Sequence, residues 1–188
     1  MKIYKTFESF LQEGVNDPGI LKAFFMAGGP GSGKSYVASE LFALPKGDDL
    51  GTVSYDNGLK LVNSDKNFEH LLKKANIDMA ELMDLKDKMP DEWQKAMQIR
   101  NQAKRLTKNM QEMYIDGRLG MIIDGTGKNY KKIEGQVDRL RALGYDCYMV
   151  FVNTSLAVAQ ERNAARPRKL PVDMVTPVSY THLTLPTI

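Results

Sequence analysis

Gly28-Gly29-Pro30-Gly31-Ser32-Gly33-Lys34-Ser35 is the stretch of sequence that decides the fold. It fits the pattern G-x-x-x-x-G-K-[ST], and it lies between an apolar run at residues 21–26 and a helical pattern over residues 34–43. Successive glycines let the backbone point several N–H groups at one anion, and the helix that follows presents its positive N-terminus to the same anion. This context predicts a site for a nucleoside triphosphate.

The side chains of residues 28–35, here called the phosphate loop, are expected to divide the binding of ATP and Mg²⁺ between them. Lys34 would reach the β- and γ-phosphates, and the Ser35 hydroxyl would ligate Mg²⁺. The fingerprint G-x-G-x-x-G does not fit, because Tyr36 stands where its third glycine belongs. The alternative is a glycine-rich turn without a ligand. The residues expected to bind ATP are Gly28, Gly29, Pro30, Gly31, Ser32, Gly33, Lys34, Ser35 and Tyr36.

Composition sets the class of the protein and the limits of its domain. Of the 188 residues, 43% are hydrophobic and 26% are charged, which is typical of a globular protein.

Residues 178–187 resemble a translation of the transposase adapter used in short-read sequencing libraries. We therefore expect residues 178–188 to be a non-native tail that replaces the natural C-terminus. Residues 1–177 would form a single domain.

Several classes of function are disfavoured by what the sequence lacks. Its apolar runs are too short for a membrane span, and its start leads into no signal-peptide core. One cysteine, Cys147, excludes a disulfide framework and fits a reducing cytoplasm. With His70 as the only histidine outside the tail, a Cys/His zinc site is excluded as well. The net charge of +3 is too mild to indicate nucleic-acid binding by itself.

Apolar runs alternate with helical periodicity along the chain, which predicts an α/β fold. The expected architecture is a three-layer parallel sheet with a helical insertion at residues 76–117. The strand at 145–152 is apolar on both faces, as a buried parallel strand would be. Strands are predicted at 21–26, 59–62, 119–123 and 145–152, and helices at 4–13, 34–43, after 65, at 91–116, 130–143 and 155–165.

Two carboxylates follow predicted strands. Asp124 ends the third strand and could hold Mg²⁺ or substrate, because parallel sheets bind ligands at that edge. Its alternative role is to accept hydrogen bonds from loop amides. Asp65 follows the second strand and could accept the proton of an attacking hydroxyl. Alternatively, it supplies negative charge at the N-terminus of the next helix.

Basic residues gather in two places where they could meet substrate. Arg162 and Arg166 lie four residues apart on the last predicted helix, with Arg168 just beyond, and residues 160–171 are predicted to be a mobile lid that neutralises phosphoryl charge. The alternative is the ordinary preference of cations for helix C-termini. Arg100 falls within the apolar stripe of helix 91–116, so we predict that it points into a cleft; its alternative is to cover apolar surface with its stem.

These residues carry a resemblance. It rests on four segments: the phosphate loop, Val62-Asn63-x-Asp65-x-x-Phe68, Ile123-Asp124-Gly125-Thr126-Gly127 and Arg162-x-x-x-Arg166. Together these segments resemble the zeta-toxin-like and polynucleotide-kinase-like P-loop kinases, of the AAA_33 type. In overall character the chain is also similar to the small kinases of tailed phages. The resemblance implies strand order 2-3-1-4, with a last strand lost beyond residue 177. It further implies Asp65 as the general base, Arg162, Arg166 and Arg168 as phosphate clamps, and Asp124 and Thr126 facing substrate or Mg²⁺.

The expected function is therefore transfer of the γ-phosphoryl of Mg-ATP to a hydroxyl of a small nucleotide-like or nucleotide-sugar acceptor, in a cytoplasm (the host's, if the chain is phage-encoded). Zeta-type enzymes usually carry Glu where this chain has Asp124, which weakens the sugar interpretation more than the kinase interpretation. Two alternatives stay open. One is a polynucleotide 5′-hydroxyl kinase, disfavoured because no aromatic-studded basic groove is visible. The other is an ATPase or switch without an acceptor.

Overall fold

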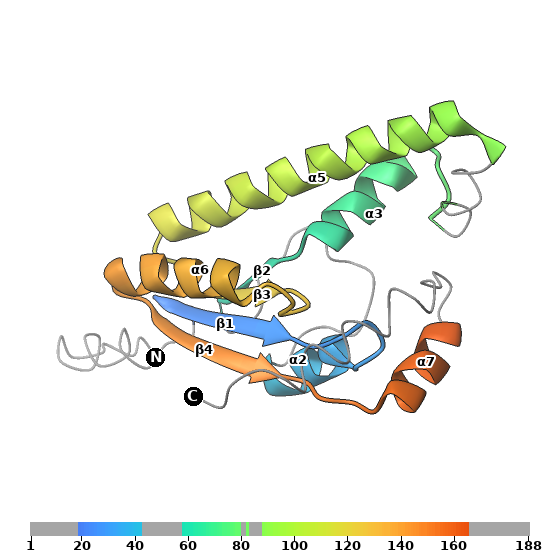
Figure 1. Cartoon of the computed structure of the whole chain (residues 1–188). Coiled ribbons are helices and arrows are strands. Elements are labelled where there is room, and N and C mark those ends of the chain that lie inside the picture. The colour runs from blue at the N-terminus through green and yellow to red at the C-terminus, as the bar shows by residue number, and fades with distance from the viewer. Residues whose placement is uncertain (1–18, 43–57, 80–81, 83–87, 166–188) are drawn as a thin grey trace, which may run out of the picture.

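The computed structural model describes residues 19–42, 58–79, 82 and 88–165 of the chain. Its sheet has four parallel strands in the order β2-β3-β1-β4 (Figure 1). Both the parallel pairing and the strand order agree with the prediction. The strands are β1 (Lys22–Ala27), β2 (Lys60–Val62), β3 (Met121–Asp124) and β4 (Asp146–Phe151).

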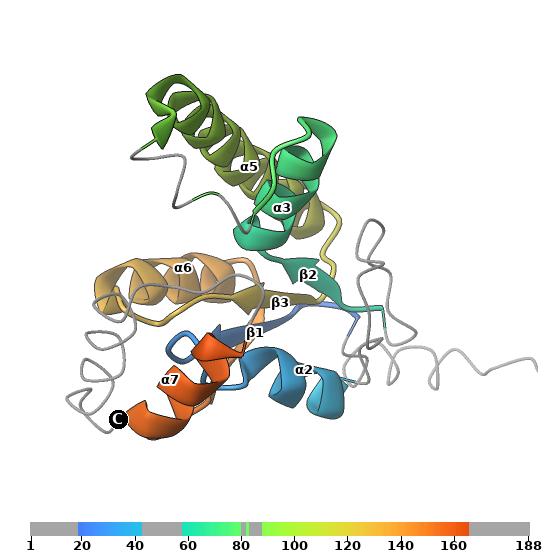
Figure 2. The same cartoon turned by 90° about the vertical axis from the view of Figure 1, so that its right-hand side faces the viewer.

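Helices lie on both faces of this sheet, so the predicted three layers are present. Seen along the sheet, α2 and α7 lie on one side and α6 lies on the other (Figure 2). The predicted helix at residues 4–13 lies outside the described residues. None of the helices in the described part of the chain is long and apolar enough to cross a membrane. The helices are α2 (Lys34–Phe42), α3 (Ser64–Lys74), α5 (Pro90–Asp116), α6 (Tyr130–Ala142) and α7 (Leu156–Ala164).

The two faces of β1 pack into two separate cores, because successive side chains of a strand point in opposite directions. Phe25 packs with Leu140 of α6 in the core on one face. Met26 packs with Ala38 of α2 in the core on the other face. The alternation fixes the register of β1, since a slip by one residue would exchange the two sets of side chains.

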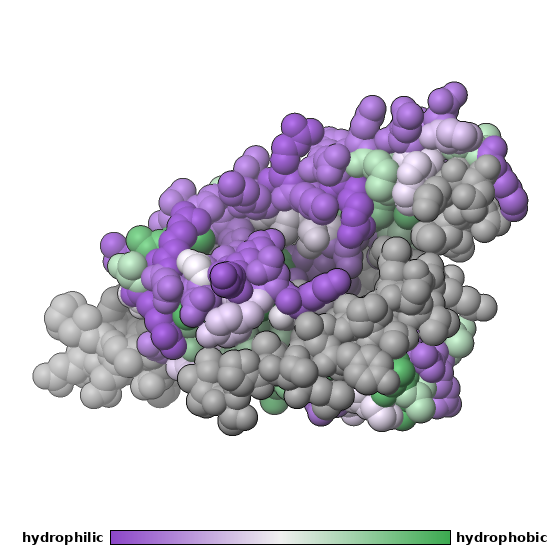
Figure 3. Space-filling view, viewed as in Figure 1, coloured by the Kyte–Doolittle hydropathy of each residue, from purple (hydrophilic) through white to green (hydrophobic). Residues whose placement is uncertain are grey.

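The predicted insertion at residues 76–117 contains α5, which pairs with the preceding helix α3, and the two helices share a core of their own. Phe68 and Leu72 of α3 are each 1% exposed and pack against Ala96 and Ala103 of α5. The prediction of a helix at 91–116 is confirmed, with Pro90 in its first turn. The surface over α5 is mainly hydrophilic (Figure 3), although two of its apolar residues, Leu106 and Met113, are exposed.

Two polar contacts fix α5 in position. Asn67 of α3 donates from Nδ2 to Thr107 Oγ1 at 2.7 Å, and the Thr107 hydroxyl in turn donates to the Ala103 carbonyl at 2.8 Å. Further along, Arg139 of α6 forms a two-pronged ion pair with Glu112 of α5. The insertion helix is therefore held by α3 and by a helix of the sheet domain.

The prediction that the last strand is buried on both faces is wrong. Tyr148, Met149 and Phe151 of β4 are 47%, 50% and 40% exposed. The physical reason is that β4 is the edge strand of the described sheet, and the α6 core takes up Cys147 but not the residues further along. Tyr148 still contributes by stacking on Phe24, with ring centres 5.2 Å apart.

We expect Leu72→Ala to lower the free energy of unfolding by about 2–5 kcal/mol, because it opens a cavity in the core of the helical pair. Glu69→Ala, an exposed change on the same helix, should stay within about 0.5 kcal/mol of the parent. Urea denaturation of both variants measures the difference. Equal stability of the two variants would show that α3 and α5 do not pack as described.

Candidate active site

The phosphate loop forms the turn between β1 and α2, as the sequence predicts. Gly31 and Gly33 have φ angles of +81° and +93°, a conformation that residues with side chains rarely adopt. Within the loop, the Ser32 N–H donates to the Gly29 carbonyl at 3.2 Å, and α2 begins at Lys34. Backbone N–H groups and the positive end of α2 thus meet at one turn, which is the arrangement that binds phosphate.

Helix α7 packs directly on this loop. A Cβ atom built on Gly31 would lie 2.3 Å from the Ala159 carbonyl oxygen, so only glycine fits beneath the helix. From the same helix, Arg162 donates from Nη1 to the Ser32 carbonyl at 3.3 Å. The structure therefore brings the predicted Arg162 to the phosphate loop, whereas Arg166 and Arg168 lie outside the described residues.

Lys34 is folded back over its own loop. Its Nζ donates to the Gly28 carbonyl at 2.7 Å and to the Gly29 carbonyl at 3.2 Å. Ser35 and Tyr36 are exposed, so a ligand in solution can reach both. The lysine charge is thus held beside the turn of backbone N–H groups.

Asp124 ends β3, and it lies beside β1 because it is in register with Met26. Its Oδ2 accepts a hydrogen bond from Asn63 Nδ2 at 2.8 Å, while its Oδ1 is buried without a hydrogen-bond partner among the described residues. Burial raises the pKa of Asp124 above the usual aspartate value; the charge of Lys34 lowers this pKa and the charge of Asp65 raises it. The charges of Lys34 and Asp65, which come from different parts of the sequence, therefore both act on the Asp124 carboxyl group.

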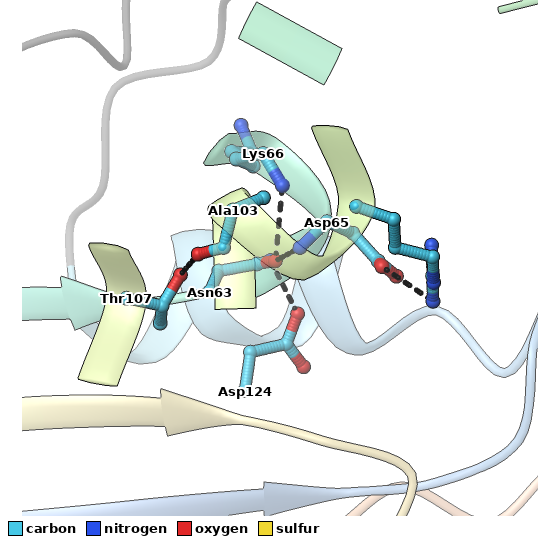
Figure 4. Close-up of polar contacts among 7 residues, drawn as sticks. Asn63, Asp65, Lys66, Ala103, Thr107 and Asp124 are labelled. Atoms are coloured by element: carbon cyan, nitrogen blue, oxygen red, sulfur yellow. Dashed lines mark hydrogen bonds and ion pairs between the residues drawn. The ribbon is translucent and has the colours of Figure 1, made fainter. Parts of the chain in front are cut away.

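Asn63 is a site residue to which the sequence analysis assigned no role. Its Oδ1 accepts hydrogen bonds from the N–H groups of Asp65 at 2.8 Å and Lys66 at 3.2 Å, which caps α3, while its Nδ2 holds Asp124 (Figure 4). One amide thus ties the end of β3 to the start of α3. The available signal was an Asn directly after a strand and before a helix, which is the preferred N-cap pattern.

Asp65 lies in the first turn of α3, where negative charge favours the helix. Its side chain is 60% exposed and pairs with Arg100 of α5, with 3.5 Å between Oδ1 and Nη2. Thr126 lies in the exposed loop after β3, and its carbonyl accepts a hydrogen bond from the Gly28 N–H at 3.3 Å. Asp65 is therefore linked to Asp124 through Asn63, Arg100 is paired with Asp65, and Thr126 is joined to the phosphate loop.

A family model described as an AAA domain, AAA_33, matches residues 24–177. This range contains the phosphate loop and every other site residue described above. No curated protein matches the chain.

Asn63→Ala should lower the free energy of unfolding by about 1–3 kcal/mol, because it removes the cap of α3 and leaves a buried carboxylate oxygen without its donor. Asn63→Ser retains a capping oxygen but not the amide donor, and it should recover part of the loss. Chemical denaturation of the two variants separates the two contacts. A parent-like Asn63→Ala would contradict the role assigned to this amide.

Asp124→Asn should stabilise the metal-free protein at neutral pH. A carboxyl group with a raised pKa weakens the folded state as pH rises from the ordinary value of 3.8 through the raised value, because the folded state binds its proton more tightly than the unfolded state does. The gain in stability should be small near pH 4 and grow towards pH 7. Urea denaturation in EDTA at several pH values measures it, and a gain that shrinks as pH rises would contradict the effect of burial.

Proposed function

This chain belongs to the AAA_33 family of AAA domains, and on that premise we propose that it is an ATP-dependent kinase. It would transfer the γ-phosphoryl of Mg-ATP to a hydroxyl of a small, nucleotide-like or nucleotide-sugar acceptor. The observation that carries the proposal is the position of Asp124, which ends β3 beside the strand that leads into the phosphate loop and is joined through Asn63 to the start of the helix that carries Asp65. A phosphate-binding lysine, a carboxylate for Mg²⁺ and a proton acceptor are roles that recur in enzymes of phosphoryl transfer, and Lys34, Asp124 and Asp65 would supply them.

The phosphate loop would hold the donor. Gly31 and Gly33 provide the turn of backbone N–H groups, and α2 adds its positive end. Lys34 would exchange the carbonyl oxygens of Gly28 and Gly29 for phosphate oxygens. The exchange is favourable because a cation binds an anionic oxygen more strongly than a neutral one.

The residues present fit Mg²⁺. The ion prefers oxygen ligands, and Asp124 offers a buried carboxylate oxygen that lacks a hydrogen-bond partner in the described part of the chain. Ser35, at the start of α2, offers a hydroxyl. We propose that these two residues, together with phosphate oxygens, hold the ion. When bound, Mg²⁺ would neutralise negative charge on the phosphates.

Asp65 would act as the general base. The acceptor hydroxyl oxygen attacks the γ-phosphorus, its proton passes to the Asp65 carboxylate, and the bond from the γ-phosphorus to the β–γ bridging oxygen breaks to release ADP. Asp65 is exposed enough to meet an acceptor, and the Asn63 cap keeps its helix beside Asp124. General-base catalysis of this kind contributes about 10²- to 10⁴-fold.

Arg162 would neutralise charge on the transferring phosphoryl group, since α7 already carries it to the phosphate loop. A chain that supplies its own arginine does not need one from a partner, which favours a kinase over a switch that waits for an arginine in trans. We propose the same role for Arg166 and Arg168, as the family resemblance implies.

Asp65→Asn should retain ATP binding within about twofold and lose at least about 10²-fold in transfer, because it removes only the proton acceptor. Lys34→Ala should weaken both ATP binding and transfer. Asp138→Asn, an exposed change on α6, should alter neither property. Titration with ATP and transfer of γ-³²P to a panel of nucleotides and nucleotide sugars measure the two effects. Normal transfer by Asp65→Asn would overturn the proposed mechanism, and ADP release that is equal with and without acceptors would favour an ATPase.

A further inference from the structure

Ser32 carries a buried oxygen that the proposed function leaves unexplained. In the described part of the chain, two side-chain oxygens are buried without a hydrogen-bond partner: Asp124 Oδ1, which we propose holds Mg²⁺, and Ser32 Oγ. Ser32 is 5% exposed and belongs to the part of the phosphate loop that α7 covers. A buried hydroxyl without a partner costs stability, so this oxygen is expected to have a ligand of its own.

A small cavity adjoins Ser32. It lies between the phosphate loop, the end of β4 and the connection from β4 to α7, where Val152, Asn153 and Thr154 line it. Its volume is about 10 Å³, which is close to what one water molecule requires and far too little for a nucleotide or a sugar. Asn153 and Thr154 have polar groups in both backbone and side chain, which are the partners that a buried water needs.

The distances across this cavity fit a bridging water. A Cβ atom built on Gly28 would lie 2.8 Å from Ser32 Oγ and 2.7 Å from the Val152 carbonyl oxygen. The two oxygens are therefore at most about 5.5 Å apart, and among the described contacts no hydrogen bond joins them directly. A water molecule that makes two ordinary hydrogen bonds spans about 5–6 Å. One water can thus donate to the Val152 carbonyl and accept from the Ser32 hydroxyl.

We propose that this cavity binds a single water molecule and that Ser32 uses the water to position α7. Helix α7 follows Val152 closely along the chain, so a water on the Val152 carbonyl fixes the start of that helix. At the other end of the helix, Arg162 donates from Nη1 to the Ser32 carbonyl at 3.3 Å. Ser32 therefore holds α7 twice, once through its hydroxyl and once through its carbonyl.

Charge favours water over a monovalent cation as the occupant. The described residues that line the cavity include no carboxylate. Helix α7 begins directly after the lining residues, with Ser155 as its N-cap, and the positive end of a helix disfavours a cation. Water is neutral, and it can both donate and accept hydrogen bonds at this place.

The position of α7 matters for catalysis if Arg162 neutralises charge on the transferring phosphoryl group, so this part rests on the proposed function. Ser32 is then a positioning residue, because its hydroxyl acts through the water and α7 on the Arg162 guanidinium. Loss of the hydroxyl should lower the rate of transfer more than it weakens ATP binding, since that guanidinium is needed most in the transition state.

The water can be sought directly. A high-resolution crystal structure of the parent should show one ordered water within hydrogen-bond distance of Ser32 Oγ and the Val152 carbonyl oxygen, and the structure of Ser32→Ala should lack it. Ser32→Ala should also lower the melting temperature by about 2–4 °C, because a hydrogen-bonded hydroxyl is lost. A hydroxyl without any partner would give the opposite sign, since its removal takes an unsatisfied group out of the interior.

Two variants separate the hydrogen bond from other effects. Ser32→Cys nearly retains the side-chain volume but bonds weakly, so it should melt like Ser32→Ala if the hydrogen bond matters and like the parent if packing alone matters. Ser39→Ala removes a serine hydroxyl from α2, where it donates to the Tyr36 carbonyl, and should melt within about 1 °C of the parent.

Salt composition distinguishes water from a cation. Exchange of K⁺ for tetramethylammonium at constant ionic strength should leave the melting temperature of the parent unchanged. A melting temperature that falls when K⁺ is removed, and does so less in Ser32→Ala, would identify a cation in the cavity and contradict the water.

Kinetics test the connection to Arg162. Ser32→Ala should lower kcat about tenfold and retain the KM for ATP within about twofold, because the loop keeps its backbone N–H groups. Arg162→Ala should lower kcat at least about 10²-fold. In the double variant, Ser32→Ala should cause a further loss of no more than about twofold, because its effect passes through Arg162.

Three results would overturn the proposal: no ordered water beside Ser32 in the parent, a melting temperature of Ser32→Ala at or above that of the parent, or fully additive losses of kcat in the double variant. Failure of the proposed function would look different. The ordered water and the change in melting temperature do not depend on catalysis, so they would persist in a protein that transfers no phosphoryl group. Transfer at the parent rate by Ser32→Ala would support the kinase and contradict the positioning role.

Discussion

The buried carboxylate of Asp124 is the constraint around which this site is organised. Removing a carboxylate from water is costly unless it is hydrogen-bonded or paired with charge. Asn63 supplies one hydrogen bond and Lys34 supplies nearby positive charge, yet one oxygen remains without a partner among the described residues. The fold therefore keeps an incompletely stabilised negative charge at the end of β3, and a bound cation would stabilise it.

That constraint extends to the helical insertion through a short series of contacts. Asn63 connects Asp124 to α3, and Phe68 and Asn67 of α3 connect to α5. The position of Arg100 therefore depends on the same helix that positions Asp65. Because α3 is connected both to Asp124 and to α5, the residues proposed to face the acceptor are held in position relative to the residues proposed to bind ATP.

Sequence patterns predicted most of the fold and the placement of Lys34, Asp124 and Arg162, because these follow from local rules: a glycine-rich turn, the end of a parallel strand, and helical spacing. Contacts between distant segments were not predictable in the same way. Nothing local shows that Asn63 faces Asp124, or that Arg100 lies over Phe68, since each depends on how strands and helices cross. The exposure of β4 was missed because an apolar run reads alike at the centre and at the edge of a sheet.

The close approach of α7 to Gly31 has a consequence for how such a chain can change over generations. The Ala159 carbonyl occupies the space that any side chain at position 31 would need. A side chain there would require α7 to move, in addition to straining a backbone with a φ angle of +81°, and a moved α7 would carry Arg162 away from the phosphate loop. The absence of a side chain at position 31 and the path of α7 are therefore coupled, so a change at one constrains the other.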